Sequence, residues 1–142
     1  MHRLLGLALV LPLLSACDPK DCTLVGCASQ LALTITGPGE VIGLSGSVTV
    51  GEHTFLVDCA SDSDPAVTCD GASLVLDLPE GVGGGEVEWS LSSDGPDGGE
   101  SGGSYAGEGA FTPDWTSSTP NGPDCGPECW SGAGSVELLG TP

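Results

Sequence analysis

Apolar residues recur at every second position in several short windows of this chain, and this period of two constrains the fold most. In QLALTIT, Leu31, Leu33 and Ile35 alternate with small or polar residues, and residues 73–78 (SLVLDL) repeat the pattern. Such alternation is typical of strands with one buried face. No window offers a convincing helix, and 24 glycines and 11 prolines disfavour one. The chain is therefore expected to be all-β.

About seven strands are expected, separated by turns rich in glycine and proline. Gly51-Glu52 lies between two alternating windows and suits a tight two-residue hairpin. The run at residues 92–104, SSDGPDGGESGGS, predicts a mobile loop. This organisation predicts an antiparallel β-sandwich of immunoglobulin-like type, with a small barrel as the alternative. The expected strands cover residues 30–36, 45–50, 53–59, 73–78, 86–91, 105–112 and 134–139.

The N-terminus has the pattern of a secretory signal peptide. His2 and Arg3 form a short basic region, residues 4–14 are apolar apart from Pro12, and Ser15 and Ala16 are small. The apolar run is too short to span a bilayer, which needs about 20 residues. A buried N-terminal helix is the disfavoured alternative, because nothing polar recurs at helical spacing.

The end of this segment, Leu14-Ser15-Ala16-Cys17, resembles the lipobox of bacterial lipoproteins. In that family the chain is cut before the cysteine, its sulfur receives a diacylglyceryl group, and its new amino group usually receives an acyl chain such as palmitate. The resemblance implies a signal peptide over residues 1–16, a lipidated Cys17 and a tether to residue 29. The sandwich domain would then cover residues 30–142. Two or more acyl chains would hold such a protein stably on a membrane.

The implied location is the bacterial cell envelope, at the outer membrane or at the periplasmic face of the inner membrane. The segment PNGPDCGPEC, residues 120–129, is also similar to the C-terminal region of small cysteine-rich exported lipoproteins with no assigned function. That second resemblance covers some ten residues and implies no activity.

Seven cysteines are an odd number. If lipidation consumes the Cys17 thiol, six remain, and an even number in an exported chain implies a disulfide framework. A zinc site at Cys125 and Cys129 is disfavoured, because no histidine is near them and an exported chain meets an oxidising compartment. The six are Cys22, Cys27, Cys59, Cys69, Cys125 and Cys129.

The expected strand order predicts part of the pairing. If the strands run up and down, Cys59 and Cys69 meet at the pole away from the tether, and their bridge contributes about 3 kcal/mol in the chain-entropy model. The other four cysteines meet at the tether pole and allow three pairings, among which the sequence does not choose. Cross-bridges from the N-terminal segment to the loop before the last strand are slightly favoured, because they close longer loops.

The charge balance excludes some partners. After removal of residues 1–16 the chain has one base, Lys20, against 20 acidic residues, a net charge of −19. Such a surface disfavours nucleic acid, whose phosphates require lysine and arginine. It also disfavours docking on anionic lipid headgroups, whereas it keeps an exposed protein soluble.

No coherent catalytic set is found, so the chain is expected not to be an enzyme and to need no cofactor. His53 is the single histidine after the signal peptide, and no GxSxG elbow presents a serine to it. Glu86 and Glu88 are expected to share the outward face of one strand. Such carboxylate pairs are mostly solvated rather than catalytic.

Two weak binding candidates remain. Asp62, Asp64, Asp94 and Asp97 lie in two loops that share a pole, and calcium binds six to eight oxygens of such groups, although neither loop has EF-hand spacing.

Trp115 and Trp130 flank the last two cysteines. They could contact a sugar or a protein, but packing over the disulfides is favoured, because the core has few aromatic residues. The sequence therefore predicts a non-catalytic structural or interaction module with an unknown protein or glycan partner. The alternative is a calcium- or carbohydrate-binding module.

Overall fold

A computed structural model describes residues 26–61, 64–95 and 103–140 of the chain. These residues contain no helix that could cross a membrane. They form ten strands: β1 (Ser29–Thr36), β2 (Ile42–Val50), β3 (His53–Asp58), β4 (Val67–Asp70), β5 (Ser73–Leu78), β6 (Val87–Asp94), β7 (Tyr105–Phe111), β8 (Asp114–Ser118), β9 (Cys129–Glu137) and β10 (Leu139–Gly140).

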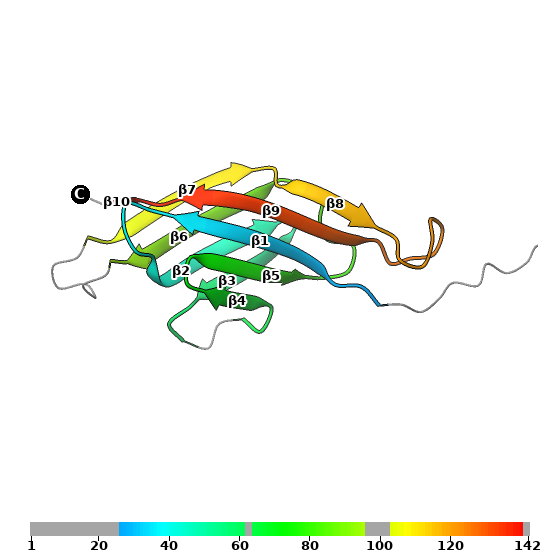
Figure 1. Ribbon diagram of the computed structural model, residues 1–142, viewed down its shortest axis with the longest axis horizontal. Helices are drawn as coiled ribbons and strands as arrows, with labels where there is room; N and C mark the ends of the chain where they lie inside the picture. Colours follow the sequence, from blue (N-terminus) through cyan, green and yellow to red (C-terminus); the bar gives the residue numbers. More distant parts are fainter. Residues whose placement is uncertain (1–25, 62–63, 96–102, 141–142) are drawn as a thin grey trace, which may run out of the picture.

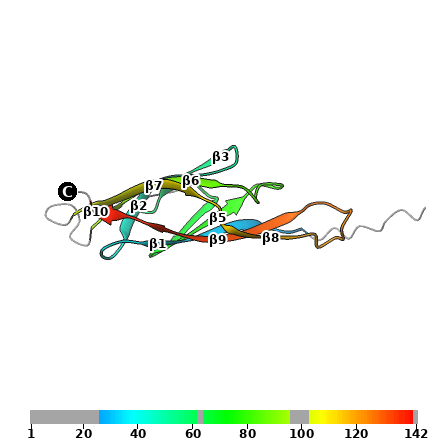
Figure 2. The same cartoon turned by 90° about the horizontal axis from the view of Figure 1, so that it is seen from above.

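The strands form two five-stranded sheets that pack face to face (Figures 1 and 2). Sheet A has the order β4-β5-β1-β9-β8, and sheet B has the order β10-β7-β6-β2-β3. Neighbouring strands are antiparallel except β1 and β9, which run parallel and begin at the same end of the molecule. We call this end the N-terminal pole, and it also holds the β2–β3 turn and the β5–β6 loop.

The all-β, two-sheet class predicted from the sequence is confirmed, but the strand count is ten instead of about seven. The additional strands β4, β8 and β10 are two to five residues long, and β9 begins at Cys129 instead of residue 134. These segments lack the alternation of large apolar residues on which the prediction relied. β8, for example, reads DWTSS and is mostly exposed.

The immunoglobulin-like arrangement is not confirmed. In an immunoglobulin constant domain the first, second, fourth and fifth strands share one sheet. Here β2, β3, β6 and β7 lie together in sheet B, whereas β1 is the central strand of sheet A. The expected hairpin at Gly51-Glu52 is confirmed, because β2 pairs with β3 up to Val50 and His53.

The chain passes from one sheet to the other twice along one side of the sandwich. β7 in sheet B leads to β8 in sheet A through Thr112 and the buried Pro113, which has no N–H to continue a ladder. β9 in sheet A leads to β10 in sheet B through Leu138, which is fully buried and donates its N–H to the Thr36 carbonyl at 2.7 Å. This side is therefore closed by continuous chain.

A disulfide joins the two sheets on the opposite side. β3 is the outer strand of sheet B and β4 is the outer strand of sheet A. Cys59 directly follows β3 and is bonded to Cys69 in β4, with their Cα atoms 5.8 Å apart. This is the bridge that the strand order predicts.

The core between the sheets is mainly aliphatic. In β1 buried and exposed residues alternate strictly, so that Leu31, Leu33 and Ile35 face sheet B. Val48 and Val50 of β2 are buried from the other side. Burying each such side chain contributes about 1.5–3 kcal/mol, so this alternation drives the two sheets together.

Aromatic rings fill the core where β7 and β9 have glycines. The Trp89 ring lies against Gly107 and Gly109, and a Cβ atom at Gly107 would lie 2.8 Å from it. Phe111 lies in the same way against Gly134, where a Cβ atom would overlap the ring. These glycines are therefore sites of close approach between an aromatic ring and the backbone.

Candidate functional site

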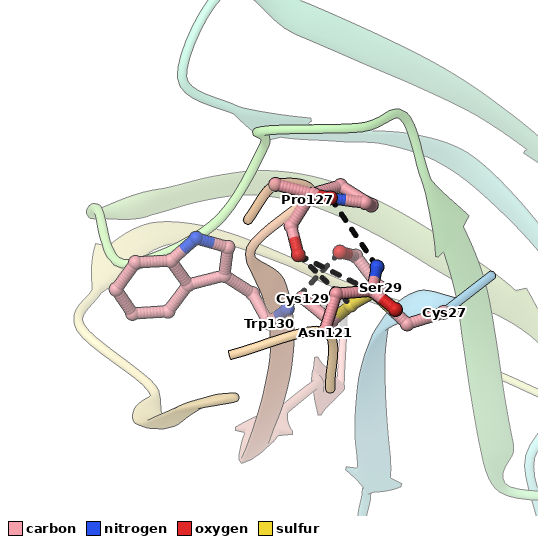
Figure 3. The surroundings of a disulfide bond; sticks show 7 residues. Cys27, Ser29, Asn121, Pro127, Cys129 and Trp130 are labelled. Atoms are coloured by element: carbon pink, nitrogen blue, oxygen red, sulfur yellow. Dashed lines mark hydrogen bonds between the residues drawn. A yellow bond between two sulfur atoms is a disulfide. The ribbon is translucent and has the colours of Figure 1, made fainter. Parts of the chain in front are cut away.

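The N-terminal pole holds the start of the domain against the β8–β9 loop. Because β1 and β9 are parallel neighbours, Cys27 just before β1 lies beside Cys129 at the start of β9 (Figure 3). The two cysteines are bonded, with their Cα atoms 5.9 Å apart and a sequence separation of 102. The Ser29 Oγ accepts the Trp130 N–H at 3.0 Å, which adds a second link between the same two strands.

The bond between Cys27 and Cys129 decides between the alternative pairings. It is one of the predicted cross-bridges, and it excludes a local bridge between Cys125 and Cys129. Cys125 is also disulfide-bonded, so all five cysteines of the described residues are oxidised. The lipidation candidate Cys17 and the disulfide candidate Cys22 lie outside the described residues.

The two tryptophans predicted as a possible contact site pack against each other and against a glycine loop. Trp115 and Trp130 meet edge to face, with ring centroids 6.3 Å apart and an interplanar angle of 86°. The Trp130 ring lies against Gly83 and Gly84 of the β5–β6 loop. Figure 3 shows this indole pointing away from the disulfide between Cys27 and Cys129.

Trp115 uses its polar edge inside the protein. Its indole N–H donates to the Gly85 carbonyl oxygen at 2.7 Å, and its ring lies against Gly132 of β9. The expectation that Trp130 packs over a disulfide is therefore corrected, because the β5–β6 loop receives its ring. The glycine run at residues 83–85 was the sequence signal for this close approach.

The calcium candidates do not converge in the part of the chain that the structure describes. The Asp64 carboxylate accepts the Ala66 N–H at 3.0 Å and so stabilises the turn before β4. Asp94, at the end of β6, lies beside Gly43. Asp62 and Asp97 lie outside the described residues. Among the described residues no three histidine, cysteine or acidic side chains form a group that could hold a metal ion.

Asp58 stabilises the turn that follows β3. Its carboxylate accepts the backbone N–H groups of Ala60 and Ser61, both at 3.2 Å, and the Ser61 hydroxyl. The Ser61 hydroxyl, followed by the Ala60 N–H, holds the pKa of Asp58 below its ordinary value. A negative charge is therefore retained at the end of β3.

His53 is exposed at the start of β3. Gly51 in the two-residue turn between β2 and β3 has a φ of 61°. Such a hairpin turn requires a positive φ at its first residue. His53 and Glu52 line a hollow of about 220 Å³ together with Gly81, Val82, Gly83 and Gly85 of the β5–β6 loop. None of the residues that line this hollow is a serine, threonine or cysteine, so it carries no nucleophile for His53 to activate.

A shallow hollow of about 520 Å³ lies on the outer face of sheet B, over β2, β6 and β7. It is lined by hydroxyls of Ser47, Thr49 and Ser90 and by the carboxylates of Glu88 and Glu108. Glu88 is paired with Ala110, and Glu108 is paired with Ser90, so the two carboxylates are diagonal neighbours on adjacent strands.

Glu86, which was expected to share the outward face of a strand with Glu88, directly precedes β6; both are exposed, and Glu86 does not line the hollow. Glu108, which shares the hollow with Glu88, was missed in the sequence because its proximity to Glu88 depends on the pairing of β6 with β7.

Searches against protein-family models, curated proteins and solved structures find no match to this chain.

Proposed function

We propose that this protein is a lipid-anchored protein of the bacterial cell envelope that acts as a non-catalytic interaction module. The observation that carries the proposal is the state of the cysteines. All five that are described are disulfide-bonded, as expected of an exported protein. In an odd total of seven, the cysteine that ends the lipobox-like segment is then the one assigned to the anchor.

In this proposal the N-terminal pole faces the membrane. Cys17 would lie ten residue steps before Cys27, a stretch that can span at most about 33–36 Å. The disulfide from Cys27 to Cys129 would transmit this connection to β9. The sheet faces, the sheet edges and the opposite pole would then be available to partners in the envelope.

The charge of the domain supports display at a distance from the bilayer. The described residues include 15 of the 20 acidic residues and no lysine or arginine. Anionic headgroups would repel such a surface within the Debye length of about 8–10 Å. The acyl groups would therefore provide the attachment, and the domain would stay free to meet other proteins.

An intact-mass measurement on protein extracted from membranes tests the anchor. We expect a chain that begins at Cys17, heavier by its acyl groups, and lighter by two hydrogens per bridge before reduction than after it. The Cys17→Ser variant should lose the acyl mass and leave the membrane fraction. A wild-type mass that fits an unlipidated chain, or an unaltered membrane fraction for Cys17→Ser, would refute the anchor.

Carbohydrate binding is the second candidate, and the hollow on the outer face of sheet B is the observation that favours it. Its hydroxyls and carboxylates are hydrogen-bond partners for sugar hydroxyls. A glycan array, with and without calcium, tests this function. Binding that is lost in Glu108→Ala would support it, and an array without any bound glycan would exclude it.

A further inference from the structure

Each sheet of the sandwich has two outer strands, and β3 differs from the other three. β10 has two residues, and β4 has four and is tied down by Cys69. β8 is bounded by Pro113 and Pro120, residues that terminate pairing. β3 has six residues, reads HTFLVD, and contains neither proline nor lysine. It is therefore neither shortened nor interrupted by proline or lysine, which are common ways to block a sheet edge.

The β2–β3 turn fixes which backbone groups of β3 are unpaired by sheet B. In a two-residue hairpin the residues that flank the turn, here Val50 and His53, form a hydrogen-bonded pair, and such pairs alternate along the ladder. The N–H and C=O groups of His53, Phe55 and Val57 therefore point to β2. Those of Thr54 and Leu56 therefore point to the free edge of the sheet, because β3 is an outer strand.

The same edge exposes an apolar side chain. Leu56 is 67% exposed, compared with 64% for Leu139 and 42% for Ile42, the other exposed large apolar residues of the described chain. A strand placed beside β3 would lay its own side chains against Leu56, and such cross-strand pairs stabilise sheets. The edge thus offers both backbone hydrogen bonds and an apolar contact.

Charge selects the occupant of this edge. Glu52 precedes β3 and Asp58 ends it, and no described residue is a lysine or arginine that would balance them. A second copy of the chain would bring the same negative charge to the edge and would be repelled. A basic segment would be attracted.

We propose that β3 accepts an extended, basic segment of a partner protein as an additional strand of sheet B. Backbone hydrogen bonds to Thr54 and Leu56 would hold the segment, and its apolar residues would contact Leu56. Basic residues near its ends would approach Glu52 and Asp58. This inference rests on the interaction role proposed above, and it does not depend on the lipid anchor.

The test uses the full processed protein in detergent, with a short peptide in which lysine and valine alternate. We expect the peptide to bind and to protect the Thr54 and Leu56 amides from hydrogen exchange. A peptide N-methylated at every residue keeps its charge but loses all its backbone donors, and should not bind. A glutamate–valine peptide should not bind either.

Two variants with a matched control locate the interaction. Leu56→Pro removes an outward N–H that β2 does not use, and Leu56→Asp adds a charge while it keeps that N–H. Both should weaken peptide binding by at least about tenfold, or 1.4 kcal/mol. Leu139→Asp introduces the same charge at a similarly exposed leucine on β10 and should leave binding unchanged.

Four results would overturn the inference. They are failure of the peptide to bind, equal binding of the N-methylated peptide, protection of amides other than those of β3, and unchanged binding by both Leu56 variants. A dimer of the protein that Leu56→Asp dissociates would show that the edge is a contact between copies. None of these results changes the mass of the anchored chain, so the anchor is judged separately.

Discussion

The indole N–H of Trp115 donates to the carbonyl oxygen of Gly85 across 2.7 Å and so ties a strand of one sheet to the loop that enters the other sheet. Trp115 lies in β8 of sheet A, whereas Gly85 lies in the loop that leads into β6 of sheet B. The bond therefore joins the two layers at the N-terminal pole. It also fixes the loop against which Trp130 packs.

Trp115→Phe should destabilise the domain by about 1–2 kcal/mol, because it keeps an aromatic ring over Gly132 but leaves the Gly85 carbonyl without this donor. Chemical denaturation followed by circular dichroism measures the change. An unchanged midpoint and slope would show that the bond contributes nothing.

Gly134→Ala should destabilise the protein by about 1–3 kcal/mol, because the added Cβ atom would overlap the Phe111 ring. Gly140→Ala is the matched control, since a Cβ atom there meets nothing within 4 Å, and it should have little effect. Phe111→Leu should recover part of the loss when it is combined with Gly134→Ala. Additive effects of the two changes would contradict the proposed contact.

Aliphatic alternation predicted β1, β5 and the β2–β3 hairpin, because each buries one regular apolar face. The strand order also placed Cys59 near Cys69, since both flank one connection. A local pattern can reveal such strands because a strand with one buried face has a fixed period of two.

The rest of the fold and of the candidate site could not be predicted from local patterns. The pairing of β1 with β9 joins segments about 100 residues apart, and no local signal specifies it. Gly132 is buried under Trp115, but a glycine adds nothing to an apolar pattern, so β8 and the first half of β9 gave no strand signal. The hollow that joins Glu88 to Glu108 likewise depends on strand pairing.

Removal of the bridge between Cys27 and Cys129 should cost more stability than removal of the bridge between Cys59 and Cys69. The first closes a loop of 102 residues and the second a loop of 10. The chain-entropy model gives about 4–5 kcal/mol for the first and about 3 kcal/mol for the second. The third bridge, which involves Cys125, lowers the value for the bridge between Cys27 and Cys129.

Paired cysteine-to-alanine variants of each bridge, compared by denaturation without reductant, measure this difference. The two variants serve as controls for each other, because each keeps the other bridge. A larger loss for the Cys59 and Cys69 variant would show that native packing around the sheet edge outweighs loop length.

Asp58 should contribute to the loss of stability in acid. Its folded pKa lies below the unfolded value of about 3.9, so its contribution is complete above that pH and is lost as the pH falls through the folded pKa. In Asp58→Asn the stability should therefore fall less steeply below a pH of about 4 than in the wild type.

Nuclear magnetic resonance titration of the Asp58 carboxyl provides the direct measurement. Ser61→Ala removes the hydroxyl that lowers the pKa most, so the pKa should rise toward its ordinary value. Ser118→Ala, at an exposed position of β8, is the control and should leave the titration unaltered. An identical Asp58 titration in Ser61→Ala would contradict the assigned cause.

The bond between Cys27 and Cys129 has a mechanical consequence. A pull applied to the N-terminal segment enters the domain at the starts of β1 and β9 together, because the disulfide makes the two strands share the load. Both strands lie inside sheet A, between β5 and β8, so the force acts along their hydrogen-bonded ladders and shears them instead of peeling an outer strand away. Reduction of this one disulfide would leave β1 to carry the load alone.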